Sequence, residues 1–232
     1  MSAGRQRSLR SMNRTEPRAR LAKRYSGGAP APRRAPLAHR TRAAYRRAMA
    51  LDWNDLLTEQ LDWHWRHQLR PRLDGLTDEE YFWEPVPDAW NVRPHGTGSA
   101  PVQAGSGPFT IDYAVPEPVP PPVTTIAWRL AHIVVGVFGM RVANHFGGPP
   151  PAYETFPYAG TALAALEQLD TAYAAWHEGV RGLGEEGLAR PCGPAEGEFA
   201  ESPMAELVLH INREAIHHGA EIALLRDLYA RR

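Results

Sequence analysis

The sequence predicts an all-α protein whose helices form a four-helix bundle. Four segments carry apolar residues at the three- and four-residue spacing that is typical of amphipathic helices. Proline- and glycine-rich stretches separate these segments, and no stretch shows the convincing alternation of apolar and polar residues that indicates strands. The chain has 232 residues, 43% of them hydrophobic, which suits one domain with a sizeable core.

Residues 1–48 are predicted to be a disordered basic tail, and residues 49–232 the folded domain. The tail holds 14 arginine and lysine residues against one acid, Glu16, and shows no sustained apolar periodicity. It therefore cannot bury enough apolar surface to offset the entropy of ordering. Three interpretations remain open: an extension that precedes a true start at Met49, a basic arm that contacts nucleic acid or membrane, and a targeting peptide.

The charge of the domain and its single cysteine exclude several classes of protein. Residues 49–232 hold 12 basic and 25 acidic residues, so this part of the chain repels nucleic acid phosphates. Cys192 is the one cysteine, which rules out an intrachain disulfide and a cysteine-based zinc finger and favours a cytoplasmic protein. No uninterrupted apolar run reaches the roughly 18 residues that a membrane span needs, so we expect no membrane association.

The first helix is predicted over Leu51–Leu73, where Asp74 and Gly75 end it. Its apolar face consists of leucine and tryptophan residues at four-residue spacing: Leu57, Leu61, Trp65, Leu69 and Leu73. The proline-rich stretch from Glu84 to Pro122 follows and cannot be helical. We expect an ordered loop there, with a short strand pair near residues 109–115. A loop of this length is unusual unless it is functional, for example as a lid.

Three further helices follow the loop. The second is predicted over Thr124–His145 and is apolar nearly all round, so it should lie at the centre of the bundle. The third spans Thr161–Leu183. The fourth should begin with Ser202 as its cap and Pro203 in its first position, and should run to Tyr229.

The fourth helix carries a carboxylate and an imidazole in the middle of its apolar face. That face comprises seven residues at three- or four-residue steps: Leu207, Ile211, Glu214, His218, Ile222, Leu225 and Tyr229. A buried carboxylate needs a partner, and Glu214 and His218 project together one helical turn apart. Two such side chains are able to hold a metal, while a buried ion pair between them without metal is the alternative.

The second helix supplies a further candidate ligand, His132, within the apolar run from Ile126 to Val135. A lone histidine in such a helix is more often a hydrogen-bonded core residue than a ligand. Together with Glu214 and His218, however, it gives two imidazoles and one carboxylate. This set suits Zn²⁺, Ni²⁺, Fe²⁺ or Mn²⁺ and leaves coordination positions open, as catalytic metal sites do.

Three other histidines are candidates for orienting a metal ligand or contacting a substrate. His210 and His217 flank Glu214 on the fourth helix, although a solvated helix surface is the preferred interpretation of both. His64 lies at the edge of the apolar face of the first helix and could point into the bundle. No residue is assigned a catalytic role from the sequence.

Three stretches of the chain resemble the DinB-like superfamily of four-helix metalloproteins. They are EYFWEPVPDAWNVRP from Glu80, TTIAWRLAHI from Thr124 and HINREAIHHGAEIALLRDLY from His210, and the resemblance covers about residues 51–230. It implies one histidine ligand from the second helix and two ligands four residues apart on the fourth. His132 and His218 match this pattern directly.

Three features depart from the pattern of the superfamily. Glu214 stands where many members carry histidine, but the mycothiol-dependent maleylpyruvate isomerase branch is similar in having His, Glu and His. Residues 95–122 resemble an insertion between the first two helices. The His-Arg-Gly-Gln ending of many members is His218-Gly219-Ala220-Glu221 in this chain.

The resemblance implies a metal-dependent enzyme in which the metal, most simply zinc, activates a low-molecular-weight thiol such as mycothiol. The thiolate would attack an electrophile in an S-transferase or isomerase reaction. Two other functions remain open: a metal-binding stress-response protein without turnover, and a metal-dependent hydrolase. The expected partners are a small thiol and an electrophile, and a homodimer is the common default for such bundles.

Overall fold

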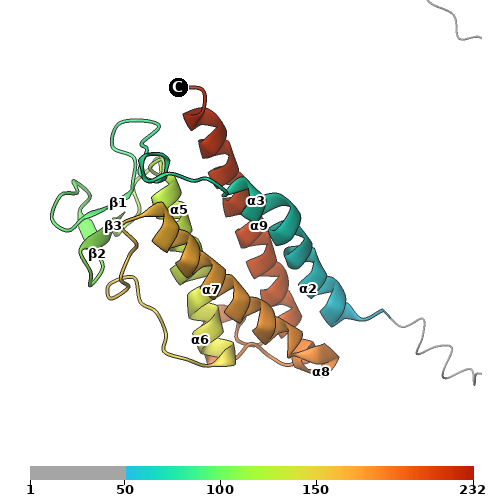
Figure 1. Ribbon diagram of the computed structural model, residues 1–232. Coiled ribbons are helices and arrows are strands. Elements are labelled where there is room, and N and C mark those ends of the chain that lie inside the picture. Colours follow the sequence, from blue (N-terminus) through green and yellow to red (C-terminus); the bar gives the residue numbers. More distant parts are fainter. Residues whose placement is uncertain (1–50) are drawn as a thin grey trace, which may run out of the picture. The chain divides into compact units, whose positions relative to one another are not determined.

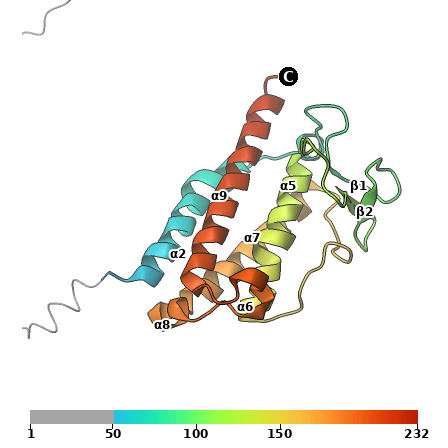
Figure 2. The same ribbon diagram turned by 180° about the vertical axis from the view of Figure 1, so that it is seen from behind.

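A computed structural model describes residues 51–232, and most of them lie in helices (Figures 1 and 2). The tail predicted over residues 1–48 lies outside the described residues. Four long helical segments lie where they were predicted in the sequence. The first consists of α2 (Trp53–His64), η1 (Trp65–Leu69) and α3 (Arg70–Arg72), and the second of α5 (Ile126–His132), η2 (Ile133–Gly139) and α6 (Met140–Phe146). The third is α7 (Ala162–Arg181) and the fourth is α9 (Met204–Tyr229). Both views show α2 and α9 side by side and running in the same direction.

Three short helices connect the long ones. They are α4 over Asp78–Tyr81, α8 over Gly184–Ala189 and η3 over Pro194–Phe199. The segment between α7 and α9 was expected to be a loop, because it is rich in glycine and proline. Two short helices, α8 and η3, form there instead. Gly184 is the first residue of α8 and Gly193 precedes η3, and both have a positive φ, which glycine adopts without steric cost.

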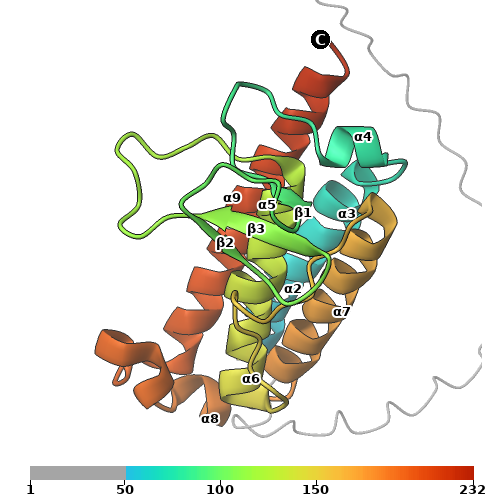
Figure 3. The same ribbon diagram turned by 90° about the vertical axis from the view of Figure 1, so that its left-hand side faces the viewer.

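The proline-rich segment before α5 forms a three-stranded antiparallel sheet, so the prediction of an all-α fold needs correction. β1 covers Val92–Pro94, β2 covers Val102–Ala104 and β3 covers Phe109–Tyr113, in the order β1-β3-β2. β3 was predicted as part of a strand pair, but its partners span three residues each and are too short to show alternation. The sheet packs through β1 and β3 against α5, on which a candidate ligand lies (Figure 3).

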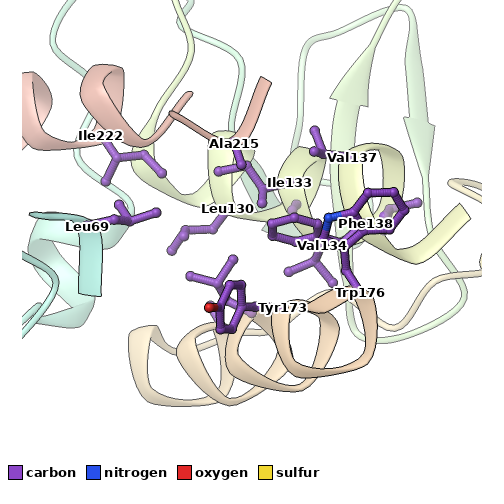
Figure 4. Packing of buried hydrophobic residues seen from close by; sticks show 14 of the residues in the cluster. Leu69, Leu130, Ile133, Val134, Val137, Phe138, Tyr173, Trp176, Ala215 and Ile222 are labelled. Carbon is purple, nitrogen blue, oxygen red and sulfur yellow. The ribbon is translucent and has the colours of Figure 1, made fainter. Parts of the chain in front are cut away.

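The second helical segment lies at the centre of the fold, as its uniform apolarity predicted. Ile133, Val135 and Phe138 of η2 are fully buried, and η2 packs between α7 and α9. Figure 4 shows Ile133 and Phe138 among the buried residues of this core. By length and composition alone the segment Ile126–Phe146 would also be able to cross a membrane, and half of it is buried inside this fold. The apolar side chains of this segment therefore fill the core of the fold.

The start of α9 differs from the prediction. The helix begins at Met204, Pro203 occupies the cap position, and Ser202 makes no side-chain cap. The reason lies in the preceding backbone, where the amide of Met204 donates to the carbonyl of Arg190 and the amide of Cys192 donates to the carbonyl of Ser202. The bond from Met204 pairs one amide of the first turn, and the amide of Glu206 pairs with the carbonyl of Pro203, so two amides are satisfied without a capping side chain.

Candidate metal centre

His132 and Glu214 each lie near His218 between α5 and α9, but the donor atoms of the three residues do not all lie within 4.8 Å of one another. His132 is the last residue of α5, and its ring lies perpendicular to that of His218, with the centroids 4.9 Å apart. A carboxylate oxygen of Glu214 lies 3.6 Å from Nε2 of His218. Because the two helices pack against each other, residues that are 82 or more positions apart in the sequence meet at one place.

The hydrogen bonds of His218 leave its Nε2 available for a metal. The Nδ1 atom lies 2.7 Å from a carboxylate oxygen of Glu221, which can only accept a hydrogen bond. A neutral His218 therefore carries its proton on Nδ1 and presents the lone pair of Nε2 toward Glu214. Arg129 binds the same oxygen of Glu221 at 3.1 Å and so fixes the carboxylate from the opposite helix.

His132 is also held through Nδ1. This atom lies 2.9 Å from the hydroxyl of Tyr153, and the ring stacks on Trp128 with the centroids 5.4 Å apart. Burial, reinforced by the nearby His218 and Arg129, lowers the pKa of His132 to about 4. Its imidazole is therefore neutral at pH 7, which is the form that binds metals. When Nδ1 donates to the tyrosine oxygen, Nε2 is left as the ligand atom.

Glu214 is less buried than its place on the apolar face suggested. Its side chain is 30% exposed, while His218 and the neighbouring Ile211 are buried. The carboxylate also lies 3.6 Å from Nδ1 of His210 and 3.6 Å from Nε of Arg213. It can therefore turn between these surface partners and His218 without the cost of an isolated buried charge.

A second donor set shares His218. Donor atoms of His217, His218 and Glu221 lie within 4.8 Å of one another, so they too could hold a metal. This set faces outward, since the His217 side chain is 63% exposed. The positive charge of Arg129 already occupies the Glu221 carboxylate, and it would oppose a cation bound there. Arg213 likewise lies 3.6 Å from the Glu214 carboxylate, so these positive charges do not separate the two donor sets.

Of the other three predicted histidines, two lie beside the site and one lies away from it. His210 contacts Glu214, and His217 contacts Glu221 at 3.4 Å. His64 lies on α2, which meets α9 on the side of Asn212 and Gly219 rather than on the side of the ligands. Its buried Nε2 has no hydrogen-bond partner within the described part of the chain.

Three residues that orient the ligands were not recognised in the sequence. Glu221 stands three residues after His218, so helical spacing alone could have indicated its contact. Arg129 stands three residues before His132 on α5 and could have been considered in the same way. Tyr153 belongs to the loop between α6 and α7, and nothing in its local sequence indicates that it reaches His132.

The family model of the DinB superfamily matches residues 60–222 of the chain. The chain belongs to the DinB superfamily. Searches of curated proteins and of solved structures returned no match. Members of this superfamily are metalloproteins, and the match spans both helices that carry the candidate ligands. Membership and the histidine–glutamate clusters together support a metal-binding protein.

Two cavities of this DinB-superfamily protein lie near the candidate ligands, and one of them is lined by a ligand, His132. The smaller, about 210 Å³, is bounded by His132 and by aromatic residues of the sheet region and α5, including Trp90, Trp128 and Tyr153. The larger, about 680 Å³, lies between α9 and the η3 segment and is bounded by His210 and Arg213, both of which contact Glu214. The smaller cavity could admit a small molecule to His132, whereas the larger one reaches only residues that contact Glu214.

Tyr153→Phe should weaken metal binding by about 10- to 100-fold, because it removes the hydrogen bond that orients His132. Isothermal titration with Zn²⁺ measures the affinity, and circular dichroism checks that the fold is unchanged. Tyr158→Phe is the matched control, because its hydroxyl binds only the carbonyl of Tyr153. An affinity for Tyr153→Phe equal to that of the wild type would show that this contact does not position a ligand.

Proposed function

We propose that this protein binds one divalent metal ion, most simply Zn²⁺, through Nε2 of His132, Nε2 of His218 and the carboxylate of Glu214. The observation that carries the proposal is the common orientation of the two imidazoles: each uses Nδ1 for a hydrogen bond within the protein and leaves Nε2 free. Two imidazoles and one carboxylate match the donors that zinc and its neighbours prefer, and they leave positions for a substrate.

We further propose that the protein is a thiol S-transferase or isomerase that uses a low-molecular-weight thiol of the mycothiol type. A metal at these ligands would lower the pKa of a thiol and supply thiolate at neutral pH. The two cavities support a reaction of two small molecules. The larger one, with charged and hydroxyl groups on its walls, suits a polar thiol, and the aromatic one beside His132 suits a smaller apolar electrophile.

The surrounding residues would prepare the site in two ways. Tyr153 and Glu221 fix the ring orientations of the histidines, and the carboxylate of Glu221 also fixes the tautomer of His218, so little reorganisation is needed when a metal binds. Trp90 and Trp128 close the small cavity, and their rings would displace water from an apolar electrophile. Oriented reactants in a dry site are the main contribution that this chain can make to the rate.

The proposed activity is tested with metal-loaded protein, mycothiol and a panel of electrophiles such as chlorodinitrobenzene and maleylpyruvate. We expect consumption of electrophile or formation of isomer that requires both the thiol and the metal, and that Glu214→Gln and His218→Ala abolish. Stoichiometric metal binding with neither thiol-dependent nor hydrolytic turnover would support the alternative of a non-catalytic metal-binding protein. Turnover that needs metal but no thiol would instead support a hydrolase.

We also propose that the four long helical segments constitute the four-helix bundle of the superfamily and that residues 95–122 are an insertion in it. The helices occupy the expected places in the sequence, and the segment 95–122 contributes β2 and β3, which lie outside the packed helices (Figure 3). The insertion also supplies Tyr113 and Ile111 to the aromatic cavity, so it would shape the specificity for the electrophile. A cytoplasmic location remains part of this proposal.

A further inference from the structure

An unbroken series of five rings bounds the smaller cavity. In order of contact they belong to Tyr113, Trp90, Trp128, His132 and Tyr153, and each ring centroid lies between 5.4 and 6.5 Å from the next. The plane of Trp90 is tilted by 45° and 34° from the planes of its two neighbours, so the wall curves around the cavity. Its volume of about 210 Å³ is below the roughly 300–1,000 Å³ of a pocket for a drug-sized ligand, so the cavity suits one compact group.

Glu117 adds a negative charge to this aromatic wall. It is exposed, and it is the one acidic residue among the described residues that line the cavity, which include no lysine or arginine. Pro116 and Pro118 stand on either side of it, and both restrict the backbone conformations open to this part of the chain. The proline-rich segment therefore holds the carboxylate beside the rings, which gives this long loop a use in binding.

Two arginines lie near the rings, but their charges are paired with carboxylates. The guanidinium of Arg129 lies 5.4 Å from the ring centroid of Trp128 and binds Glu221 at 3.1 Å. The guanidinium of Arg141 lies 3.5 Å from the carboxylate of Glu196, and neither arginine lines the cavity. The unpaired charge at the cavity is therefore negative, and it acts together with the negative faces of the rings to attract a cation.

The side chains of the cavity favour one class of cation over another. A primary ammonium group has three N–H donors that need acceptors, and one of the few side-chain oxygens here, the hydroxyl of Tyr153, is already bonded to His132. A quaternary ammonium group has no N–H donor, and its alkyl groups spread the charge over an apolar surface that can contact ring faces directly.

We propose that the smaller cavity binds the quaternary ammonium group of a small substrate, with the aromatic rings around the cation and the carboxylate of Glu117 beside it. This names the chemical class of the molecule in the cavity assigned above to the electrophile. The inference rests on the proposed function only in treating that cavity as a substrate site, because binding of the cation needs neither the metal nor the thiol.

Isothermal titration of the full-length protein with choline tests the proposal, both metal-free and loaded with zinc. Dimethylbutanol is the matched ligand, because a carbon atom replaces the quaternary nitrogen of choline and keeps its shape without the charge. We expect choline to bind at least about 10-fold more tightly than dimethylbutanol in both forms of the protein, since the ring faces and Glu117 attract only the cation. Ethanolamine, which carries a primary ammonium group on the same chain, should bind more weakly than choline.

Two variants separate the attraction of charge from apolar contact. Glu117→Gln and Tyr113→Leu should each lower the affinity for choline by about 3- to 10-fold, because one removes the carboxylate and the other removes a ring face but keeps an apolar side chain. The affinity of both variants for dimethylbutanol should stay close to that of the wild type. Glu167→Gln is the control, because Glu167 is an exposed carboxylate on α7 that does not line the cavity.

Equal affinities for choline and dimethylbutanol would overturn the proposal, as would ethanolamine binding as tightly as choline or choline binding that both cavity variants leave unchanged. Each of these results would make the cavity something other than a quaternary ammonium site, and none of them bears on thiol chemistry. Selective binding of choline by a protein without thiol-dependent turnover would instead support this inference and overturn the proposed transferase or isomerase.

Discussion

His218→Ala is expected to reduce the affinity for Zn²⁺ by more than about 100-fold. Residues that only orient a metal ligand typically contribute 10- to 100-fold to affinity, and loss of a ligand should cost more. His218 belongs to both donor sets described above, because Glu214 faces its Nε2 while Glu221 binds its Nδ1. Competition titration against a chelator of known affinity measures the change, and thermal unfolding without metal confirms that the variant folds.

His217→Ala is the matched comparison for this prediction. It removes the neighbouring imidazole, which is exposed and which belongs only to the outer set with Glu221. We expect its zinc affinity to remain within a few-fold of the wild type, whereas Glu214→Gln should weaken binding strongly. The reverse order, with His217→Ala as the damaging variant and Glu214→Gln as the harmless one, would place the metal on the outer set.

Arg226→Met should lower the free energy of unfolding by about 3–5 kcal/mol, since it removes one partner of a buried ion pair. The guanidinium of Arg226 binds both carboxylate oxygens of Glu80, at 2.7 and 3.0 Å, and their side chains are 17% and 7% exposed. It also donates to the carbonyls of Arg72 and Asp74. One side chain thereby joins the end of α9 to α3 and α4.

Urea unfolding of the metal-free protein measures this loss of stability. Glu178→Gln is the control, because Glu178 and Arg181 form an ion pair that is largely exposed and should contribute less than about 1 kcal/mol. A change below about 1 kcal/mol for Arg226→Met would mean that water replaces the lost contacts at Glu80. In that case the ion pair would not be the link that holds α9 to α4.

The long helices were predictable because each buries a face at regular spacing, and that spacing is visible in the sequence. His132 and His218 were identifiable as imidazoles within apolar segments, with the family pattern indicating that they meet. Glu214 was recognised from the same spacing. Its partial exposure was not predicted, because exposure depends on how closely η3 and α6 approach α9, and this is a property of packing between distant segments.

The contacts that orient the ligands were harder to predict for the same reason. Tyr153 reaches His132 from a loop 21 residues away, and the sequence between them does not determine the path of that loop. β3 was predicted near residues 109–115, but β1 and β2 were missed because they are short and are stabilised by tertiary contacts. One example is the buried Asp112, which accepts hydrogen bonds from Asn91 and Arg93. Local propensity gives little indication of such pairs.

Elemental analysis of the untagged wild-type protein tests the metal centre most directly. The protein is produced in separate cultures supplied with zinc, nickel, iron or manganese, and metal is counted per chain after removal of loosely bound ions. The ligand geometry predicts about one tightly bound divalent ion per chain in at least one culture, and its loss in Glu214→Ala and His218→Ala. Absence of stoichiometric metal under every supply would contradict the proposed centre.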